Sequence, residues 1–196
     1  MKEIALHILD IAENSIAAQA TAIEILIEDD AVRNRLRVSI RDDGQGMDPA
    51  TLQAIGDPFV TSRTTRVAGL GVPLLKAAAE ACNGCLTVQS APAGGTALSA
   101  EFQRDHIDRM PLGDLAGTLL GLVVGRPGVD WRFRYRTAAG SFSFDTVSIR
   151  QALGELPLSD PAILRWLRQT LEQGIREAEK GPAFSGAAAR SDYQEA

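Results

Sequence analysis

Residues 41–71 read RDDGQGMDPATLQAIGDPFVTSRTTRVAGLG, and this stretch decides the fold. It begins with two carboxylates, passes through a first pair of glycines and ends at a second pair, Gly69 and Gly71, before an apolar helical segment. Glycine lets the backbone approach a ligand closely, and the free N–H groups at a helix start attract anions. The stretch therefore predicts a carboxylate that can read a base, a flexible polar lid over residues 57–68 and a cradle for phosphates.

The segments on either side of this stretch follow two periodicities. Before it, isoleucines recur at helical spacing over residues 4–19 and then occupy every second position over 23–27. Leu36, Val38 and Ile40 alternate with polar residues over 35–41. After it, an apolar helix from Val72 precedes two strands that end near Gln103. The order helix, two strands, loop, helix, two strands predicts an α+β fold, in which helices pack on one face of a mixed, mostly antiparallel sheet.

The sequence changes in character after Arg104. An apolar helical segment spans residues 112–124, aromatic residues alternate with arginines in an expected hairpin over 131–144, and Ser159-Asp160-Pro161 opens a final helix. We therefore predict three parts: an α/β domain over 1–104, a small α+β appendage of helix, hairpin and helix over 105–180, and a disordered tail over 181–196. The arginine stripe of the hairpin favours a solvated face over a surface for a partner protein or nucleic acid.

Composition and charge narrow the range of functions. The chain has 196 residues, 45% of them hydrophobic and 23% charged, which is typical of a globular protein. Its net charge of -5 argues against nucleic acid as a partner. No apolar run approaches the roughly 20 residues of a membrane helix, and the amphipathic N-terminus is unlike a signal peptide, so we expect a cytoplasmic protein. Cys82 and Cys85 form a C-x-x-C pair, for which core packing is favoured over redox or metal chemistry because His7 and His106 are the only histidines.

Four segments follow one another in the order and spacing of a known kind of ATP site. They are Asp10-x-x-x-Asn14, Asp42-x-Gly44-x-Gly46, Gly69-x-Gly71 and Gly94-Gly95-Thr96. Over residues 1–104 the chain resembles the GHKL superfamily, which includes gyrase, heat-shock chaperone ATPases, mismatch-repair ATPases and histidine kinases. The resemblance implies the Bergerat-type fold, a two-layer α/β sandwich. Asp57-Pro58-Phe59 matches the phenylalanine box of the kinase branch. Within that branch the chain is similar to small stand-alone ATP-binding proteins, such as the anti-sigma kinases and the short proteins encoded beside iron-only hydrogenases.

The resemblance implies roles at the phosphate end of the site. Asn14 matches the asparagine that binds Mg²⁺, and Mg²⁺ prefers oxygen ligands such as its amide. Asp10, one helical turn earlier, matches the general base, where glutamate is usual; aspartate is shorter, so its reach to an attacking water or hydroxyl is an open question. The residues expected in the lid and around the phosphates are Phe59, Arg63, Arg66, Gly69, Leu70 and Gly71. The alternative for Asp10, Asn14 and His7 is a solvated polar helix face, and for the two lid arginines a role in solubility alone.

At the base end, Asp42 is expected to accept a hydrogen bond from the exocyclic amine of adenine. This contact would select ATP over GTP, because guanine carries a carbonyl at that position. Gly44 and Gly46 would let the backbone pass close to the base and the ribose, and Thr96 matches the threonine that supports the adenine contact. The alternative for Asp42 is a turn aspartate that caps its own loop.

The combined prediction is a protein that binds ATP with Mg²⁺ and transfers the terminal phosphoryl group, leaving ADP. The acceptor would be water or a Ser, Thr or His of a partner protein. Histidine kinases carry a dimerisation helix pair with the phospho-accepting histidine before this domain; the printed sequence has none, so we expect no autophosphorylation on an internal histidine. The alternative is an ATP-gated binding module with little turnover, whose lid or C-terminal part engages the partner. A homodimer stays among the options.

Overall fold

The computed structural model describes residues 2–55, 71–154 and 156–180. The elements in chain order are α1 (Ile4–Ala17), β1 (Ala22–Asp30), β2 (Arg35–Asp42), α2 (Pro49–Ala54), α3 (Gly71–Ala81), β3 (Cys85–Ser90), β4 (Thr96–Gln103), α4 (Leu115–Gly125), β5 (Asp130–Thr137), β6 (Ser141–Asp145), α5 (Thr146–Leu153) and α6 (Pro161–Lys180). The predicted lid and tail lie outside the described residues, as do five predicted site residues, Phe59, Arg63, Arg66, Gly69 and Leu70. None of the described helices is both long enough and apolar enough to cross a membrane.

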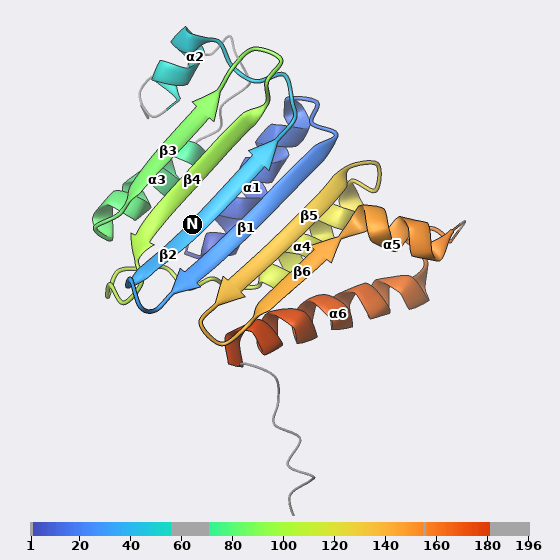
Figure 1. Ribbon diagram of the computed structural model, residues 1–196. Coiled ribbons are helices and arrows are strands. Elements are labelled where there is room, and N and C mark those ends of the chain that lie inside the picture. The colour runs from blue at the N-terminus through green and yellow to red at the C-terminus, as the bar shows by residue number, and fades with distance from the viewer. Residues whose placement is uncertain (1, 56–70, 155, 181–196) are drawn as a thin grey trace, which may run out of the picture.

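Within the described residues the strands form one six-stranded sheet in the order β3-β4-β2-β1-β5-β6. Strands β1 and β5 run parallel, and the other neighbouring strands run antiparallel. Helices α1, α3 and α4 cover one face of the sheet, whereas α6 lies along its β6 edge (Figure 1). The predicted fold class, an α+β sandwich with a mixed and mostly antiparallel sheet, is confirmed.

The core lies between this sheet and its helices because each element has one apolar side. Ile23, Ile25 and Ile27 of β1 are at most 1% exposed, and they face the helices in alternation with half-buried residues. Ile4 and Ile8 of α1 are buried to the same degree. Burying one such side chain stabilises the fold by roughly 1.5–3 kcal/mol. The isoleucines therefore fix how α1 is rotated, and this rotation determines which of its polar side chains reach the site.

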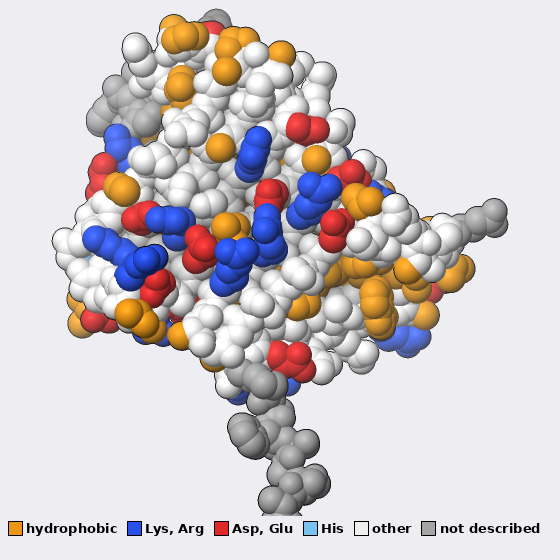
Figure 2. Space-filling view, in the orientation of Figure 1, with side chains coloured by type: hydrophobic (Ala, Val, Ile, Leu, Met, Phe, Trp, Pro, Cys, Tyr) orange, Lys and Arg blue, Asp and Glu red, His pale blue; other side chains and the backbone are white. Residues whose placement is uncertain are grey.

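The opposite face of the sheet is open and charged, and Figure 2 shows lysine or arginine and acidic side chains interleaved over its middle strands. Glu28 of β1 forms ion pairs with Arg37 on β2 and Arg136 on β5. Arg134 pairs with Glu24, and Arg132 pairs with Asp145. The arginine stripe of the hairpin thus belongs to an exposed face on which its charges are paired. Exposed pairs of this kind contribute only about 0–1 kcal/mol each to stability.

The part of the chain beyond residue 104 is built into the same sheet. β5 pairs with β1 along its length, with Ile23 opposite Trp131 and Ile25 opposite Phe133. The segment before α4 returns to the start of the chain, where the carbonyls of Pro111 and Leu112 accept the backbone N–H groups of Ile4 and Ala5. These carbonyls satisfy two donors that the first turn of α1 cannot pair internally. The C-terminal part therefore supports the helix that carries Asp10 and Asn14.

Three details of the expected elements were wrong. β1 continues to Asp30, three residues beyond the expected alternation over 23–27, because Asp29 and Asp30 still pair across to β2. α4 begins at Leu115 rather than at residue 112, since the residues before it cap α1. Helix α5 was not predicted at all; the Asp145 side chain caps it by accepting the N–H of Val147, which allows a short helix to start directly at the end of β6.

Candidate functional site

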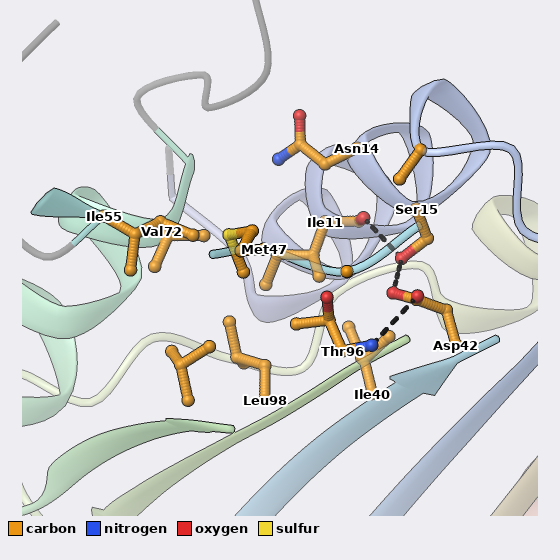
Figure 3. A pocket seen from close by; sticks show the side chains of 13 residues that line it. Ile11, Asn14, Ser15, Ile40, Asp42, Met47, Ile55, Val72, Thr96 and Leu98 are labelled. Atoms are coloured by element: carbon orange, nitrogen blue, oxygen red, sulfur yellow. Dashed lines mark hydrogen bonds between the residues drawn. The ribbon is translucent and has the colours of Figure 1, made fainter. Parts of the chain in front are cut away.

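A pocket opens between α1 and the sheet, at the end where β2 leads into the loop that contains Gly44 and Gly46 (Figure 3). We call this segment the glycine loop. The empty space within its walls is about 560 Å³, part of which is open solvent. The residues that line it are Ile11, Asn14, Ser15, Ala18, Ile40, Asp42, Gly46, Met47, Ile55, Val72, Val88, Thr96 and Leu98. Most of this wall is aliphatic, and the polar groups come from few positions.

Asp42, the last residue of β2, is the buried acidic group of this pocket and is 9% exposed. Its Oδ1 accepts the N–H of Gly44 at 3.0 Å and that of Thr96 at 3.1 Å, and its Oδ2 accepts the hydroxyl of Ser15 at 2.6 Å. An ionised carboxylate offers about four acceptor positions. Asp42 therefore does cap its own turn, and it keeps acceptor capacity for a donor in the pocket.

Ser15 is a site residue that the sequence reasoning missed. It follows Asn14 on α1, is 4% exposed, and lines the pocket while its hydroxyl holds Asp42. The feature of the sequence that could have indicated Ser15 is a single hydroxyl on the isoleucine-rich side of a helix. A hydroxyl buried there needs a polar partner to compensate for its burial. Because Ser15 and Asp42 are 27 residues apart, the partner could not be read from the sequence.

Replacing Ser15 with alanine is expected to lower the free energy of unfolding by about 1–3 kcal/mol, because a buried carboxylate loses its shortest hydrogen bond. Urea denaturation followed by circular dichroism measures this loss. Ser143, an exposed residue of strand β6, provides the control, and its alanine variant should unfold like the wild type. Equal stability of the two variants would contradict the role given to Ser15.

The glycine loop is held by backbone contacts on two sides. Gln45 donates its N–H to the carbonyl of Ala18 at the end of α1, and Gly95 donates to the carbonyl of Gly44. Gly46 has a φ of +66°, and a Cβ there would overlap the backbone of Ala91. Only glycine satisfies both demands. The loop thus joins α1 to the β3–β4 turn and places Gly46 in the pocket wall.

Thr96 and Ser90 complete the hydrogen-bonded frame around the loop. The Thr96 N–H binds Asp42, and its hydroxyl lies 3.1 Å from that of Ser90. Ser90 also accepts the N–H of Met47 at 2.9 Å and donates to the carbonyl of Gly95 at 2.8 Å. Ser90 was not predicted; it ties the loop to the sheet, whereas Thr96 lines the pocket itself.

Asp43, beside the buried Asp42, is turned away from the pocket. Its carboxylate accepts the N–H and the hydroxyl of Thr21 and the N–H of Ala22, at 2.6 to 2.8 Å. Burial would raise the pKa of Asp43, but these hydrogen bonds outweigh that effect and lower it below its usual value. Asp43 therefore fastens the start of β1 to the glycine loop.

Asn14 and Asp10 lie one turn apart on α1 and meet different surroundings. Asn14 is half-buried and lines the pocket. In Figure 3 it lies on the α1 side of the pocket, and Ile40 and Leu98 lie on the sheet side. Asp10 is outside the pocket wall, and its carboxylate lies against Gly71, where an added Cβ would overlap it. A carboxylate is favourable beside the start of a helix such as α3. The structure thus brings Asn14 and Asp42 to one pocket, with Asp10 at its edge.

The described residues contain no group of three or more His, Cys, Asp or Glu side chains that could hold a metal. Cys82 is buried and Cys85 exposed, and both are free thiols. Burial raises the pKa of the Cys82 thiol. An amide oxygen such as that of Asn14 fits a cation that arrives with an anionic ligand, because Mg²⁺ keeps most of its shell as water and phosphate oxygens.

Comparison with known proteins bears on the first half of the chain. Residues 2–106 match the family model described as histidine kinase-, DNA gyrase B-, and HSP90-like ATPase. The sensor protein kinase FleS of Pseudomonas aeruginosa is 42% identical over 58 residues, which make up 30% of this chain and 14% of that protein. Sporulation kinase A of Bacillus subtilis is 28% identical over 104 residues, 53% of this chain and 16% of the kinase. The matches thus cover less than a fifth of either kinase.

Among solved structures, the N-terminal domain of a DNA repair protein superposes with a TM-score of 0.55. It is 14% identical, and the match covers 74% of this chain and 52% of that one. At this identity the likeness concerns the fold alone. It extends beyond the region that the family model matches, since 74% of the chain is more than residues 2–106 contain.

Proposed function

The chain belongs to the family of histidine kinase-, DNA gyrase B- and HSP90-like ATPases, and from this premise we propose that its pocket binds ATP together with Mg²⁺. The observation that carries the proposal is that a buried carboxylate, Asp42, and an amide, Asn14, line the same pocket from opposite elements. A nucleotide needs this combination, since one end is a flat base with an amine and the other is a polyanion with a cation.

The adenine would lie over the aliphatic wall, with its amine directed at Asp42. Ile40, Val88 and Leu98 offer this wall from three neighbouring strands. Asp42 accepts and does not donate when ionised, so it matches the amine of adenine and opposes the carbonyl of guanine. The site should therefore prefer ATP to GTP, and Ser15 and Thr96 keep the carboxylate in place for this choice.

The phosphates would extend toward Asn14 and the start of α3. The Asn14 amide oxygen would complete the coordination of Mg²⁺, which neutralises charge on the phosphate oxygens. Val72, in the first turn of α3, lines the pocket, so free N–H groups of that turn are close to the ligand. Removing Mg²⁺ with EDTA should accordingly weaken ATP binding more than adenosine binding.

With ATP bound, we propose that Asp10 acts as the general base. It would take the proton of a water, or of a hydroxyl of a partner protein, as that oxygen attacks the terminal phosphorus and the bond to ADP breaks. The position of its carboxylate against Gly71 supports this, because the start of α3 is where the phosphates would end. Whether water or a protein side chain accepts the phosphoryl group would depend on the partner protein and not on this chain.

Replacing Asp10 with asparagine is expected to lower the rate of phosphate release about 100-fold or more, the size of a general-base contribution. Affinity for Mg-ATP should stay within a factor of about two, since Asp10 is outside the pocket wall. Single-turnover assays with radiolabelled ATP measure the rate, and calorimetry measures the affinity. Glu13→Gln, an exposed change on the same helix, is the control. Turnover that survives in Asp10→Asn would show that another group is the base.

A second function, an ATP-gated binding module, is favoured by one observation. Asp10 is not among the residues that line the pocket, and its side chain is one methylene shorter than the glutamate usual at a general base. In this alternative the nucleotide sets the contact with a partner protein, and little ATP is turned over. Tight binding of Mg-ATP with neither phosphate release nor label on a co-purified protein would support the module over the enzyme.

A further inference from the structure

The hydroxyl of Ser90 has all of its hydrogen-bonding positions filled. It accepts the N–H of Met47 at 2.9 Å, donates to the carbonyl of Gly95 at 2.8 Å and lies 3.1 Å from the hydroxyl of Thr96. A serine hydroxyl has one proton and two lone pairs. Because a carbonyl oxygen only accepts, the contact with Gly95 uses the proton, and the contacts with Met47 and Thr96 each use a lone pair.

This assignment of the proton fixes the direction of the hydrogen bond between Ser90 and Thr96. The distance alone allows either hydroxyl to be the donor. Since the proton of Ser90 is already used by Gly95, Thr96 donates and Ser90 accepts. The Thr96 hydroxyl makes no second hydrogen bond within the described residues, so both of its lone pairs are free. Thr96 lines the pocket beside Asp42 (Figure 3), and its hydroxyl therefore offers a ligand acceptor positions only.

Ser15 is the other hydroxyl side chain in the described pocket wall, and its proton is also held within the protein. Its oxygen lies 2.6 Å from the Asp42 carboxylate and 3.3 Å from the carbonyl of Ile11. Both of these partners accept and do not donate when Asp42 is ionised. The base end of the pocket thus presents three side-chain oxygens, from Asp42, Ser15 and Thr96, and none of them directs an O–H group at a ligand.

We propose that Ser90 is a positioning residue that sets base specificity, because it holds the Thr96 hydroxyl as an acceptor and so excludes bases with a carbonyl in place of the adenine amine. Such a role rests on the proposed function, since it takes this pocket as the adenine site. It adds to the selection made by Asp42, which accepts from the amine directly. Ser90 is not part of the pocket wall and acts through Thr96.

The difference between the bases shows what this orientation does. Adenine carries an amine with two N–H groups, whereas hypoxanthine, the base of ITP, carries a carbonyl oxygen at the same position. A carbonyl that faces only acceptors stays unpaired, which costs affinity. A Thr96 hydroxyl that was free to turn could donate to this carbonyl and remove part of the cost. Ser90 prevents the turn, because it already accepts the Thr96 proton.

The test removes the Ser90 oxygen and asks whether Thr96 then accepts a carbonyl base. The full-length wild type is compared with Ser90→Ala, with Thr96→Val and with the double variant; valine has the shape of threonine, and its N–H still reaches Asp42. Calorimetric titrations use the Mg²⁺ complexes of ATP, ITP and purine riboside triphosphate. The third nucleotide has neither amine nor carbonyl, so it measures any general loosening caused by loss of the Met47 and Gly95 contacts.

For Ser90→Ala we expect the affinity for ITP, relative to that for purine riboside triphosphate, to rise about fivefold, the effect of one hydrogen bond. The double variant should lose this gain, because valine has no proton to donate. A relative ITP affinity that Ser90→Ala leaves unchanged would overturn the inference, and so would a gain that persists in the double variant.

Thr96→Val alone supplies a measurement that does not depend on the folding of Ser90→Ala. Because the wild-type hydroxyl only accepts, its loss should lower the relative affinity for ATP about fivefold and leave that for ITP within a factor of about two. A relative ITP affinity that falls in Thr96→Val would show that Thr96 donates in the wild type, against the inference. A wild-type protein that binds none of the three nucleotides would instead refute the proposed function.

Discussion

Replacing Asp42 with asparagine is expected to weaken ATP binding about 100-fold, or roughly 2.7 kcal/mol, while the protein stays folded. The asparagine carbonyl can still accept the N–H groups of Gly44 and Thr96. Its amide then faces Ser15, whose hydroxyl can accept as well as donate. The frame around the loop survives, but the pocket now presents a donor to the amine of adenine.

This reversal gives the experiment a second readout. Hypoxanthine carries a carbonyl where adenine carries its amine, so Asp42→Asn should lose much less affinity for ITP than for ATP. Calorimetric titrations with both nucleotides give the ratio, and Asp43→Asn is the matched control. Asp43 faces away from the pocket, and an asparagine retains an acceptor for its backbone donors. An ATP affinity that Asp42→Asn leaves unchanged would mean that this carboxylate does not read the base.

Ending the chain after Arg104 is expected to leave a fragment that does not fold. The cut removes β5, which pairs with β1 along its length, and the helix α4 that packs on α1. It also removes the carbonyls of Pro111 and Leu112 that accept the first N–H groups of α1. Several isoleucines become partly exposed, and complete burial of one such side chain stabilises a fold by roughly 1.5–3 kcal/mol. The total stability of a typical domain is only about 5–15 kcal/mol.

Circular dichroism and proton NMR of the purified fragment measure this outcome. A chain ended after Lys180 keeps every described element and serves as the control. The division after Arg104 predicts instead an independent domain, so a fragment 1–104 with dispersed amide signals and a cooperative melt would support that division. It would contradict the view that the C-terminal part is a structural support of α1.

Local patterns were enough to predict most of the elements, whereas the resemblance to the GHKL superfamily singled out Asn14 and Thr96, which line the pocket with Asp42. The isoleucine spacing of residues 4–19 and 23–27 located α1 and β1, and their burial explains why this pattern is reliable. The Asp42 turn followed from a carboxylate beside two glycines. These features depend on neighbours within a few residues, which a sequence displays directly.

Long-range contacts were beyond such reasoning. The parallel pairing of β1 with β5 joins residues more than 100 positions apart, as in Ile23 opposite Trp131, and leaves no local pattern. Ser15 and Ser90 serve the site through partners elsewhere in the chain, and a lone serine carries no sign of its partner. Helix α5 is a short element that depends on the Asp145 cap more than on any periodicity.

The central claim is that Asn14 and Asp42 flank one adenine nucleotide, and a crystal structure with Mg²⁺ and a non-hydrolysable ATP analogue tests it most directly. We expect the adenine amine about 2.9 Å from an Asp42 carboxylate oxygen and Mg²⁺ about 2.1 Å from the Asn14 amide oxygen. A nucleotide bound elsewhere on the protein, or a pocket that stays empty at a saturating concentration of the analogue, would contradict the claim.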